Sequence, residues 1–514
     1  MPSSRWPIER PFSSPLIMSN SPHLLDRIDR WAQICPERLA HTSGGRSLSW
    51  ARLIAQSDAL ALWLETKLAG TLGPIAVHGH KEPEMIVAFL AAVKCGRPYV
   101  PMDSSIPEPR IAKIVEGAAA SLVLTPERIG AILAELPAAQ TRKPVRRVEG
   151  TDPFYILFTS GSTGEPKGVV ITLANLSAFV DWLLSEHSFA EQGEVFLNQA
   201  PFSFDLSVMD LFGSLATGGT LASVTKEELS NLKALYLRLA DSGITSWVST
   251  PSFAQMCLIE KGFRSAMLPA MKRFLFCGET LAPETAAQLL ERFPEAEVWN
   301  TYGPTEATVA TTSVRVDTAL LEAYSPLPVG YEMPGTRVVV VDENGVEVPE
   351  GERGEIVIAG PNVSPGYLKR PELTEKAFGQ RDGQRCYRTG DWGRAKAGLI
   401  FFEGRMDGQV KMNGYRIELG DLEANLRILP EIADAVVLPV QKNGKVESLA
   451  AFVVLSGPKG GSDFEVSALL KTKLGEHLPA YMLPRKITFL DAFPMTPNGK
   501  ADRKKLAELL GQKP

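Results

Sequence analysis

Cysteine is sparse in this sequence, and its spacing excludes two common ways of stapling a fold. Only five cysteines occur among the 514 residues, at Cys35, Cys95, Cys257, Cys277 and Cys386. They form no CxxC pair, so the sequence predicts neither a disulfide framework nor a zinc site. Scattered thiols are typical of reducing compartments, and we therefore expect a cytoplasmic protein.

Long hydrophobic runs are also lacking. No stretch reaches the roughly 18 consecutive apolar residues that a membrane helix needs, so no membrane span is expected. The first twenty residues contain no long apolar region and do not resemble a signal peptide. Residues 1–21 are rich in Pro and Ser, and we expect them to form a disordered tail.

No charge of one sign dominates the chain. The 54 Lys and Arg residues face 59 Asp and Glu residues, which gives a formal net charge of −5. This mild acidity supplies no general reason to bind nucleic acid or an anionic membrane. The chain is 44% hydrophobic and 22% charged, as ordinary globular proteins are, and its length predicts two or more domains.

Apolar strands alternate with helical patterns through the first two thirds of the chain. Strands are expected within 73–80, 97–103, 121–125, 194–198, 244–252, 271–280 and 296–308, and helices within 81–96 and 107–120. This rhythm predicts an α/β fold with parallel-rich sheets packed with helices. Ligands in such sheets lie beyond the carboxyl ends of the strands, so the turns that follow the strands are the places to look for chemistry.

The pattern changes after about residue 330. Residues 336–360 are typical of β-hairpins, and a helix is expected from about 464 to 477 within a small α+β unit. A charged, glycine-bracketed link at 403–409 separates the β-rich segments. We expect a large N-terminal domain over 22–405, which ends in a β-rich subdomain, and a small, mobile α+β domain over 406–514.

The segment FYILFTSGSTGEPKGVVIT, residues 154–172, holds a glycine- and hydroxyl-rich loop between two apolar runs. It is not a Walker A motif, which reads GxxxxGK[ST] and opens onto a helix. Its glycines still let backbone N–H groups turn toward an anion. Ser160, Ser162 and Thr163 add hydroxyl groups, and Lys167 adds positive charge. A plain surface hairpin is the alternative, but such loops carry function more often than packing, which favours phosphate binding.

This loop is the first of six ordered motifs. The others are FSFDLSVMDLF, NTYGPTEAT, YRTGD, GRMDGQVKMNGYRIE and a late NGK. Together, over about residues 22–510, they resemble the motif series of the adenylate-forming superfamily, which includes acyl-CoA synthetases, luciferases and peptide-synthetase adenylation domains. The segments WVSTPSFAQMCL, FLFCGE and LPAYMLPRK look most like the subfamily of carrier protein ligases that activate D-alanine.

The resemblance implies an AMP-forming ligase that uses ATP and Mg²⁺. Such an enzyme joins D-alanine to AMP and passes it to the phosphopantetheine thiol of a D-alanyl carrier protein, for modification of lipoteichoic acid. It further implies a set of ATP-binding residues, which are Thr159, Ser160, Gly161, Ser162, Thr163, Lys167, Asn300, Thr301, Tyr302, Gly303, Pro304, Thr305, Asp391, Phe402, Glu403, Gly404, Arg405 and Lys500.

Three of the implied roles concern the nucleotide directly. Tyr302 would stack on adenine, Asp391 would accept hydrogen bonds from the ribose hydroxyls, and Glu306 would bind Mg²⁺, which takes one or two carboxylates plus phosphate oxygens. Without the motifs, a core tyrosine, a turn aspartate and a surface glutamate would be the ordinary interpretations of these residues.

The amino-acid pocket is centred on Asp205, which lies in an apolar context. A buried, unpaired carboxylate is costly, so Asp205 needs a cation. The ammonium group of an amino acid would supply one, and an internal Arg or Lys partner is the alternative. By resemblance, Leu206, Met209 and Cys277 would form walls of the pocket, and Val309 would line it through its backbone. Cys277 is a soft wall residue in this interpretation rather than a nucleophile.

The C-terminal motifs imply movement between two states. Lys500, in the NGK motif, would reach both the substrate carboxylate and the α-phosphate, because a lysine acts as a point charge on a flexible stem. A solvated surface lysine is the alternative. Asp407 matches the family's hinge position. The KMNGYRIE segment would face the site in the thioester-forming state, with Gly414 beside the incoming phosphopantetheine.

Two other classes of function remain open from the sequence. An acyl-CoA or aryl-acid ligase would not need Asp205, and a non-catalytic binding protein would not need Lys500 or Asp391. Within the favoured class, the alternative is a stand-alone peptide-synthetase adenylation enzyme for another small amino acid.

Overall fold

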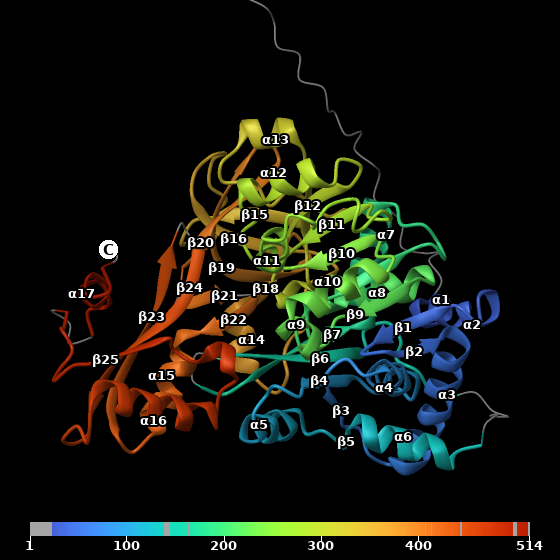
Figure 1. Ribbon diagram of the computed structural model, residues 1–514, viewed down its shortest axis with the longest axis horizontal. Coiled ribbons are helices and arrows are strands. Elements are labelled where there is room, and N and C mark those ends of the chain that lie inside the picture. The colour runs from blue at the N-terminus through green and yellow to red at the C-terminus, as the bar shows by residue number, and fades with distance from the viewer. Residues whose placement is uncertain are drawn as a thin grey trace, which may run out of the picture.

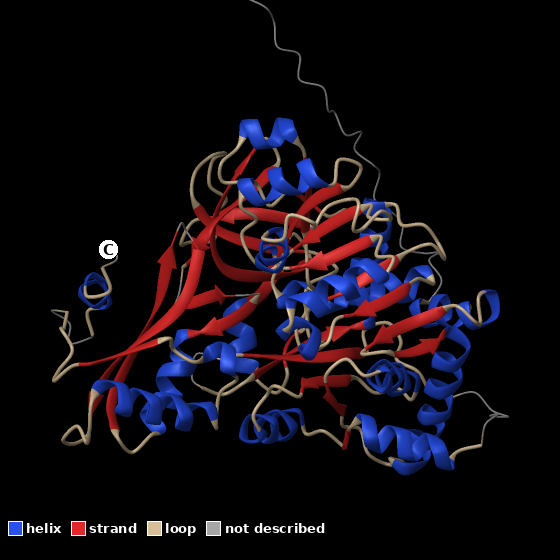
Figure 2. Cartoon of the chain, viewed as in Figure 1, coloured by secondary structure: helices blue, strands red, loops and turns tan. Residues whose placement is uncertain are grey.

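The computed structural model describes residues 23–137, 144, 146–161, 164–406, 408–412, 414–442, 445–496 and 501–511. Three sheets and their helices make up the large N-terminal part, and two smaller sheets with their helices make up the C-terminal part, which lies to one side (Figures 1 and 2). The expected α/β class is confirmed. No helix among these residues combines the length and apolarity needed to cross a membrane.

A six-stranded sheet carries the glycine-rich loop, and its strand order is β17-β7-β6-β4-β3-β5. β3 to β6 pair in parallel, whereas β6 and β7 form an antiparallel hairpin around the loop. The strands are β3 (Ile75–Gly79), β4 (Tyr99–Asp103), β5 (Leu122–Leu124), β6 (Pro153–Thr159), β7 (Lys167–Thr172) and β17 (Gly366–Tyr367). The helices of this region are α3 (Trp50–Lys67), α4 (Pro83–Lys94), α5 (Glu108–Ala118), α6 (Pro126–Glu135) and α7 (Leu173–His187).

A nine-stranded sheet supplies the other strand ends at the site, in the order β14-β13-β12-β11-β10-β8-β9-β1-β2. Its middle pairs are parallel and its two margins are antiparallel. The strands are β1 (Leu39–Ser43), β2 (Arg46–Ser49), β8 (Val195–Asn198), β9 (Thr220–Ser223), β10 (Ser246–Ser249), β11 (Arg273–Phe276), β12 (Glu297–Tyr302), β13 (Thr312–Val316) and β14 (Tyr331–Glu332). The accompanying helices are α1 (Leu24–Asp29), α2 (Trp31–Ile34), α8 (Leu206–Thr217), α9 (Lys226–Ser230), α10 (Leu232–Asp241), α11 (Pro251–Leu258), α12 (Pro283–Arg292), η1 (Thr305–Ala307) and α13 (Thr318–Ala323).

The hairpins expected over 336–360 are present in a five-stranded antiparallel sheet. It contains β15 (Arg337–Val341), β16 (Gly354–Ala359), β18 (Phe378–Arg381), β19 (Gln384–Lys396) and β20 (Leu399–Arg405), with α14 (Pro371–Ala377) beside it. β19 is the long central strand, and it pairs with β16, β18 and β20. Its residue Asp391 lies opposite Arg405 of β20, which brings two predicted nucleotide-binding side chains together.

The C-terminal part has its own apolar core. A two-stranded sheet, β21 (Gln409–Met412) and β22 (Tyr415–Glu418), leads into α15 (Leu419–Ile428). A three-stranded sheet follows, made of β23 (Ile432–Lys442), β24 (Lys445–Leu455) and β25 (Lys486–Phe489), with α16 (Asp463–Gly475), η2 (Ala480–Met482) and α17 (Arg503–Glu508). The helix expected at about 464–477 corresponds to α16. The apolar side chains of these elements form a separate buried cluster.

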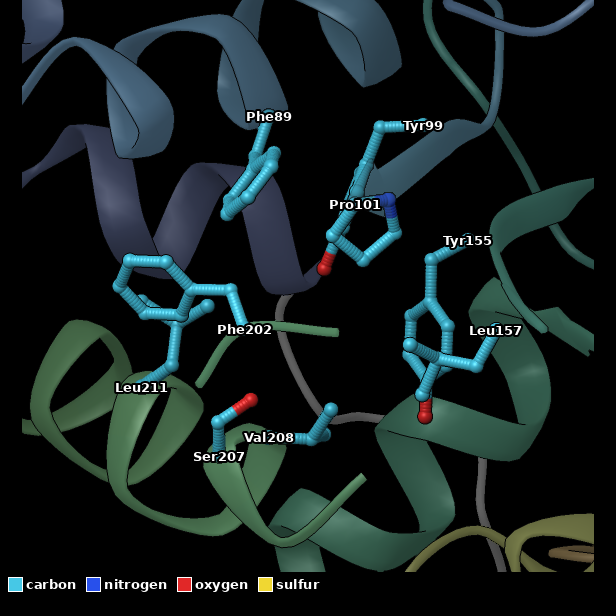
Figure 3. Close-up of a pocket in the computed structure, with 9 residues that line it drawn as sticks. All are labelled: Phe89, Tyr99, Pro101, Tyr155, Leu157, Phe202, Ser207, Val208 and Leu211. Atoms are coloured by element: carbon cyan, nitrogen blue, oxygen red, sulfur yellow. The ribbon is translucent and has the colours of Figure 1, made fainter. Parts of the chain in front are cut away.

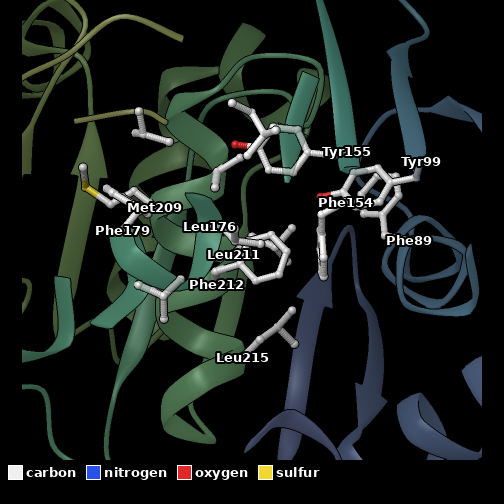
Figure 4. Close-up of a cluster of buried hydrophobic side chains, with 14 of the residues drawn as sticks. Phe89, Tyr99, Phe154, Tyr155, Leu176, Phe179, Met209, Leu211, Phe212 and Leu215 are labelled. Atoms are coloured by element: carbon white, nitrogen blue, oxygen red, sulfur yellow. The ribbon is translucent and has the colours of Figure 1, made fainter. Parts of the chain in front are cut away.

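Alternation along the parallel strands explains how helices cover both faces of the nine-stranded sheet. Phe196 and Val248 point into the cluster shared with α4, α7, α8 and the six-stranded sheet, whereas Leu197 and Trp247 point into the cluster shared with α10, α11 and α12. Neighbouring side chains of a strand face opposite ways, so strands covered on both faces carry apolar residues at consecutive positions, as at Phe196 and Leu197. Figure 4 shows part of the first cluster.

This aromatic core holds α8 in place. Phe154 packs edge-on against Phe212 of α8, with ring centroids 5.5 Å apart. A small cavity nearby is lined from α4, β4, β6 and α8, by residues that include Phe89, Tyr99 and Val208 (Figure 3). Because α8 begins directly after Asp205, its packing fixes where that carboxylate lies.

Candidate active site

The loop between β6 and β7 adopts the tight shape that its glycines allow. A Cβ on Gly161 would lie 2.2 Å from the carbonyl oxygen of Glu165, and Gly164 has a φ of +83°. Only glycine accommodates both conditions without strain. The side-chain oxygen of Thr159 is buried and has no hydrogen-bond partner among the described residues. Ser162 and Thr163, which were also predicted to bind phosphate, lie outside the described residues.

Groups of the C-terminal part contact this loop at Ser160 and Gly164. The Ser160 hydroxyl donates to the carbonyl of Arg416 at 3.0 Å and accepts the N–H of Glu418 at 3.1 Å. A Cβ on Gly164 would lie 3.0 Å from the Cβ of Ala424 in α15. The C-terminal part therefore covers the loop that the sequence predicts to hold phosphates.

Glu306 lies fully buried at the centre of a charged cluster. Its Oε1 accepts the Tyr367 hydroxyl at 2.7 Å and lies 3.7 Å from Lys167 Nζ, while its Oε2 accepts from Arg416 at 2.6 Å. Burial opposes ionisation, yet Arg416 and Lys167 hold the pKa of Glu306 well below its usual value. The predicted metal ligand is thus an ionised carboxylate whose two oxygens already have partners in this arrangement.

The same cluster affects Lys167. Burial lowers the pKa of its ammonium, and Arg416 lowers it further, whereas Glu306 raises it. The ammonium also lies 4.6 Å from the centre of the Tyr367 ring. The carboxylate of Glu306 and the face of the Tyr367 ring therefore hold Lys167, the predicted phosphate contact, in place.

The nucleotide-binding candidates Tyr302, Asp391 and Arg405 form one hydrogen-bonded set. The Tyr302 hydroxyl donates to Asp391 Oδ2 at 2.6 Å, and Arg405 donates to Asp391 Oδ1 at 2.8 Å. The Phe402 ring lies 6.0 Å from the Tyr302 ring. Burial, followed by the charge of Asp391, raises the pKa of the Tyr302 hydroxyl well above its usual value, so this hydroxyl remains a donor.

The remaining nucleotide candidates lie at the end of β12, in the turn that follows it, or on β20. The Asn300 side chain donates to the Pro328 carbonyl at 2.7 Å, and the Thr301 hydroxyl donates to the Phe276 carbonyl at 2.8 Å. A Cβ on Gly303 would lie 2.6 Å from Ala310 Cα. Backbone packing of this kind fixes the turn that contains Pro304 and Thr305.

Glu403 and Gly404 lie next to Arg405 at the end of β20. Glu403 is ion-paired with Arg353 at 3.4 Å and Arg394 at 3.2 Å, and Gly404 has a φ of +108°. The nucleotide contact expected of Glu403 remains a prediction.

Asp205 stands at the N-terminal end of α8, where its Oδ2 accepts the Thr305 hydroxyl at 2.5 Å. No Lys or Arg in the described part of the chain forms an ion pair with it. The alternative of an internal basic partner is therefore not found there. Burial raises the pKa of this carboxyl, with opposing contributions from Thr305 and Lys411. A cation at this position would be stabilised.

The four predicted wall residues, Leu206, Met209, Cys277 and Val309, are all buried and belong to the large apolar core of the N-terminal part. The Cys277 Sγ lies 3.6 Å from the Val309 carbonyl oxygen and donates to it. Burial raises the pKa of the Cys277 thiol, which makes it a poor nucleophile and agrees with its predicted role as a wall.

Strained backbone marks the turn that passes this wall. Thr308 and Val309 have φ values of +55° and +71°, a region that β-branched residues avoid. The Thr308 hydroxyl donates to the Asn362 carbonyl at 2.6 Å, which helps to hold the turn. Strain of this kind persists where the surroundings determine the backbone, commonly at binding sites.

The KMNGYRIE segment faces the site. Lys411 Nζ lies 5.7 Å from the centre of the Tyr302 ring, and Arg416 reaches Glu306. Asp407, the predicted hinge, and Lys500, the predicted catalytic lysine, lie outside the described residues.

Sequence reasoning missed three residues, namely Tyr367 and Arg416, which complete the charged cluster around Glu306, and Glu279, which bonds to the segment that faces the site. Each bonds to a partner far away in the chain: Tyr367 to Glu306, Arg416 to Glu306, and Glu279 to Gly414. Arg416 lies inside a motif that was singled out, so the motif was a usable signal. Glu279 likewise ends the quoted segment FLFCGE, whereas the local sequence offered no signal for Tyr367.

Two models of enzyme families match most of the chain. A model described as "AMP-binding enzyme" matches residues 28–368, and one described as "AMP-binding enzyme C-terminal domain" matches residues 421–500.

Among curated proteins, the chain is similar to ligases from two bacilli. It is 46% identical over 499 residues to the D-alanine–D-alanyl carrier protein ligases of Bacillus cereus (strain B4264) and Bacillus thuringiensis (strain Al Hakam). In both cases the match covers 94% of this chain and 98% of the relative.

Solved structures of adenylation enzymes share the fold. The Vibrio cholerae adenylation domain AlmE, in complex with glycyl-adenosine-5′-phosphate, has a TM-score of 0.82 at 21% identity and covers 99% of this chain and 100% of its own. An artificially fused adenylation–PCP di-domain from Klebsiella oxytoca, NpsA-ThdA, has a TM-score of 0.78 at 26% identity and covers 91% of this chain and 93% of its own.

Proposed function

The chain belongs to the AMP-binding enzyme family, among its D-alanine–D-alanyl carrier protein ligases, and from this premise we propose that it activates D-alanine with ATP and loads it onto a carrier protein. The loaded D-alanine would serve the modification of lipoteichoic acid. The observation that carries the proposal is Asp205, a carboxylate without a basic partner among the described residues, beside the small buried wall at Cys277.

The proposed reaction has two steps. A carboxylate oxygen of D-alanine attacks the α-phosphorus of ATP, the bond to the β-phosphate breaks, and pyrophosphate leaves. The thiol of the carrier's phosphopantetheine then loses its proton and attacks the carbonyl carbon of D-alanyl-AMP. AMP leaves, and a thioester remains.

Each step needs groups that the site contains. Asp205 binds the ammonium of D-alanine, since a charge-assisted hydrogen bond is about twice as strong as a neutral one. The loop at 159–167 binds phosphates through backbone N–H groups, hydroxyls and Lys167. Tyr302 and Asp391 hold the adenosine, and Lys500 holds the reacting carboxylate and the α-phosphate.

The described arrangement suits the second step better than the first. The Arg416 side chain donates a hydrogen bond to Glu306, and the Ser160 hydroxyl is bonded to the backbone of Arg416 and Glu418. In this arrangement Glu306 does not fit a metal ion. Its donor chemistry fits Mg²⁺ together with phosphate oxygens once Arg416 withdraws, and Mg²⁺ bound there would neutralise phosphate charge.

Replacement of Arg416 by Mg²⁺ at Glu306 requires the C-terminal part to move. We take the large domain to span residues 22–405 and the small domain 406–514, with Asp407 as the hinge. The matched models at 28–368 and 421–500 support a division between them. A cytoplasmic location fits the scattered thiols and the use of ATP.

Exchange of labelled pyrophosphate into ATP, measured across D- and L-amino acids, tests the proposal. We expect D-alanine to give the highest kcat/KM. A higher value for another small amino acid would favour a stand-alone adenylation enzyme for that substrate. Exchange driven by fatty or aryl acids, or by no acid, would refute amino-acid activation.

A further inference from the structure

The carboxylate of Glu279, like that of Glu306, joins the large part of the molecule to the segment that faces the site. Its Oε2 accepts the backbone N–H of Ser252 at 3.1 Å and the Ser252 hydroxyl at 2.5 Å. Its Oε1 accepts the backbone N–H of Gly414 at 2.8 Å. Glu279 lies 135 residues before Gly414, and its two oxygens are divided between the two parts.

The backbone at Gly414 is docked too closely for any side chain. Its φ is +84°, and a Cβ there would lie 2.4 Å from Thr250 Cγ2. A Cβ on Gly278 would lie 3.6 Å from both Phe204 and Thr250, and 4.0 Å from the Gly414 carbonyl oxygen. Two glycines, a threonine and an aromatic ring therefore meet at this point, directly beside Cys277 of the proposed D-alanine pocket.

This docking belongs to one arrangement of the molecule. While Gly414 is held here, Arg416 two residues later engages Glu306, and Glu418 engages Ser160. The groups proposed to bind ATP phosphates are then in use, so the contact between Glu279 and Gly414 serves a step in which those phosphates are absent.

Resting on the proposed function, we propose that Glu279 is a positioning residue for the transfer of D-alanine to the carrier thiol. Its carboxylate holds Gly414 against Thr250 and Gly278, next to the adenylate, and has no part in forming the adenylate. A carboxylate suits this place because both of its oxygens accept, and both face N–H or O–H donors.

The Glu279→Gln variant tests this role, because glutamine has one acceptor oxygen and one donor NH₂. The NH₂ group of the glutamine would then face a donor, either at Ser252 or at the backbone N–H of Gly414. We expect transfer from preformed D-alanyl-AMP to the carrier protein to fall about 10- to 100-fold, the usual range for losing a hydrogen bond to a charged group. ATP–pyrophosphate exchange, including the KM for D-alanine, should stay within about twofold of wild type.

Two further variants guard the interpretation. Glu284→Gln removes an identical charge at an exposed position of α12 and should leave both half-reactions unchanged. Gly414→Ala places a methyl group against Thr250 and should reproduce the selective loss of transfer while Glu279 is intact. Thermal unfolding of all three variants verifies that they fold.

The outcomes separate the inference from the proposed function. Equal loss of exchange and transfer in Glu279→Gln would make Glu279 a general support of the pocket and overturn the inference, as would unchanged transfer. Absence of D-alanine-dependent exchange in the wild type would instead overturn the proposed function.

Discussion

Replacing Asp205 by asparagine isolates the charge that the proposed pocket uses to hold an amino acid. The Asp205 Oδ2 already accepts the Thr305 hydroxyl at 2.5 Å, which leaves Oδ1 for the ammonium group. Asparagine keeps the shape and one acceptor but removes the negative charge. A hydrogen bond to a charged group contributes about 1.5–3 kcal/mol, so the KM for D-alanine should rise roughly 10- to 150-fold.

The same charge predicts a pH dependence. Burial raises the pKa of Asp205 above its ordinary value, and an ammonium ligand binds the ionised form. Affinity for D-alanine should therefore be complete above that raised pKa and should decline as the pH falls through it. In the Asp205→Asn variant this decline should disappear, because the amide does not titrate.

The assay is ATP–pyrophosphate exchange with D-alanine and ATP titrated separately over a range of pH. Asp210→Asn is the matched control on the same helix. Asp210 is fully buried and its Oδ1 accepts from the Asn198 side chain rather than from Thr305, so its replacement by asparagine should leave the KM for D-alanine nearly unchanged. An unchanged KM for D-alanine in Asp205→Asn, or an equal rise in the KM for ATP, would refute the assignment of Asp205 to the ammonium.

Three other perturbations follow from the same arguments. Lys500→Ala should abolish exchange while equilibrium binding of ATP survives, since a lost transition-state donor costs about 3 kcal/mol or more; wild-type exchange would contradict this role. Cys277→Ala should lower the D/L ratio of kcat/KM for alanine, because enantiomers of equal volume are separated only by where a wall stops the methyl group, and even a whole methylene is worth only about 1–3 kcal/mol; an unmoved ratio would make Cys277 ordinary packing. Lys81 donates to three backbone carbonyls, and burial lowers its pKa to about 7. Between that pH and the pKa of lysine in the unfolded chain, the unfolded chain binds more protons than the folded protein. The free energy of unfolding should therefore rise with pH over this range, by at most about 5 kcal/mol. Denaturant unfolding of Lys81→Met should lack this rise, and an identical pH profile would show that Lys81 stays charged when buried.

The sequence predicted the strands because their environment left a strong local pattern. Parallel strands covered on both faces carry consecutive apolar residues, as in the FLF run of β11. Helices between them follow from the same rhythm. The loop at 159–167 was visible because glycine and hydroxyl residues interrupt two such runs.

The pairing of distant side chains left no such pattern. Nothing local to Tyr367 indicates that it bonds across the site, and the segment FLFCGE drew attention to Glu279 without indicating its partner, because the partner is set by how whole sheets pack. The expectation that Glu306 would bind a metal ion considered only its own motif. The structure adds Arg416 at 2.6 Å, from a motif 110 residues later, which changes what occupies that carboxylate.

Glu306 links the two proposed steps through its need for a positive partner. A fully buried carboxylate without a counter-charge is strongly unfavourable, so Glu306 requires a cation whether or not ATP is bound. Arg416 and Lys167 supply it in the described arrangement, and in the proposed first step Mg²⁺ would take the place of Arg416 beside Lys167. Because the carboxylate of Glu306 has a cation beside it in both arrangements, neither arrangement has to bury it unpaired, and the two can lie close in free energy. If Mg²⁺ and ATP bind only the arrangement without Arg416 at Glu306, as we propose, their binding would shift the population toward it, since a ligand moves an equilibrium only by its difference in affinity for the two states.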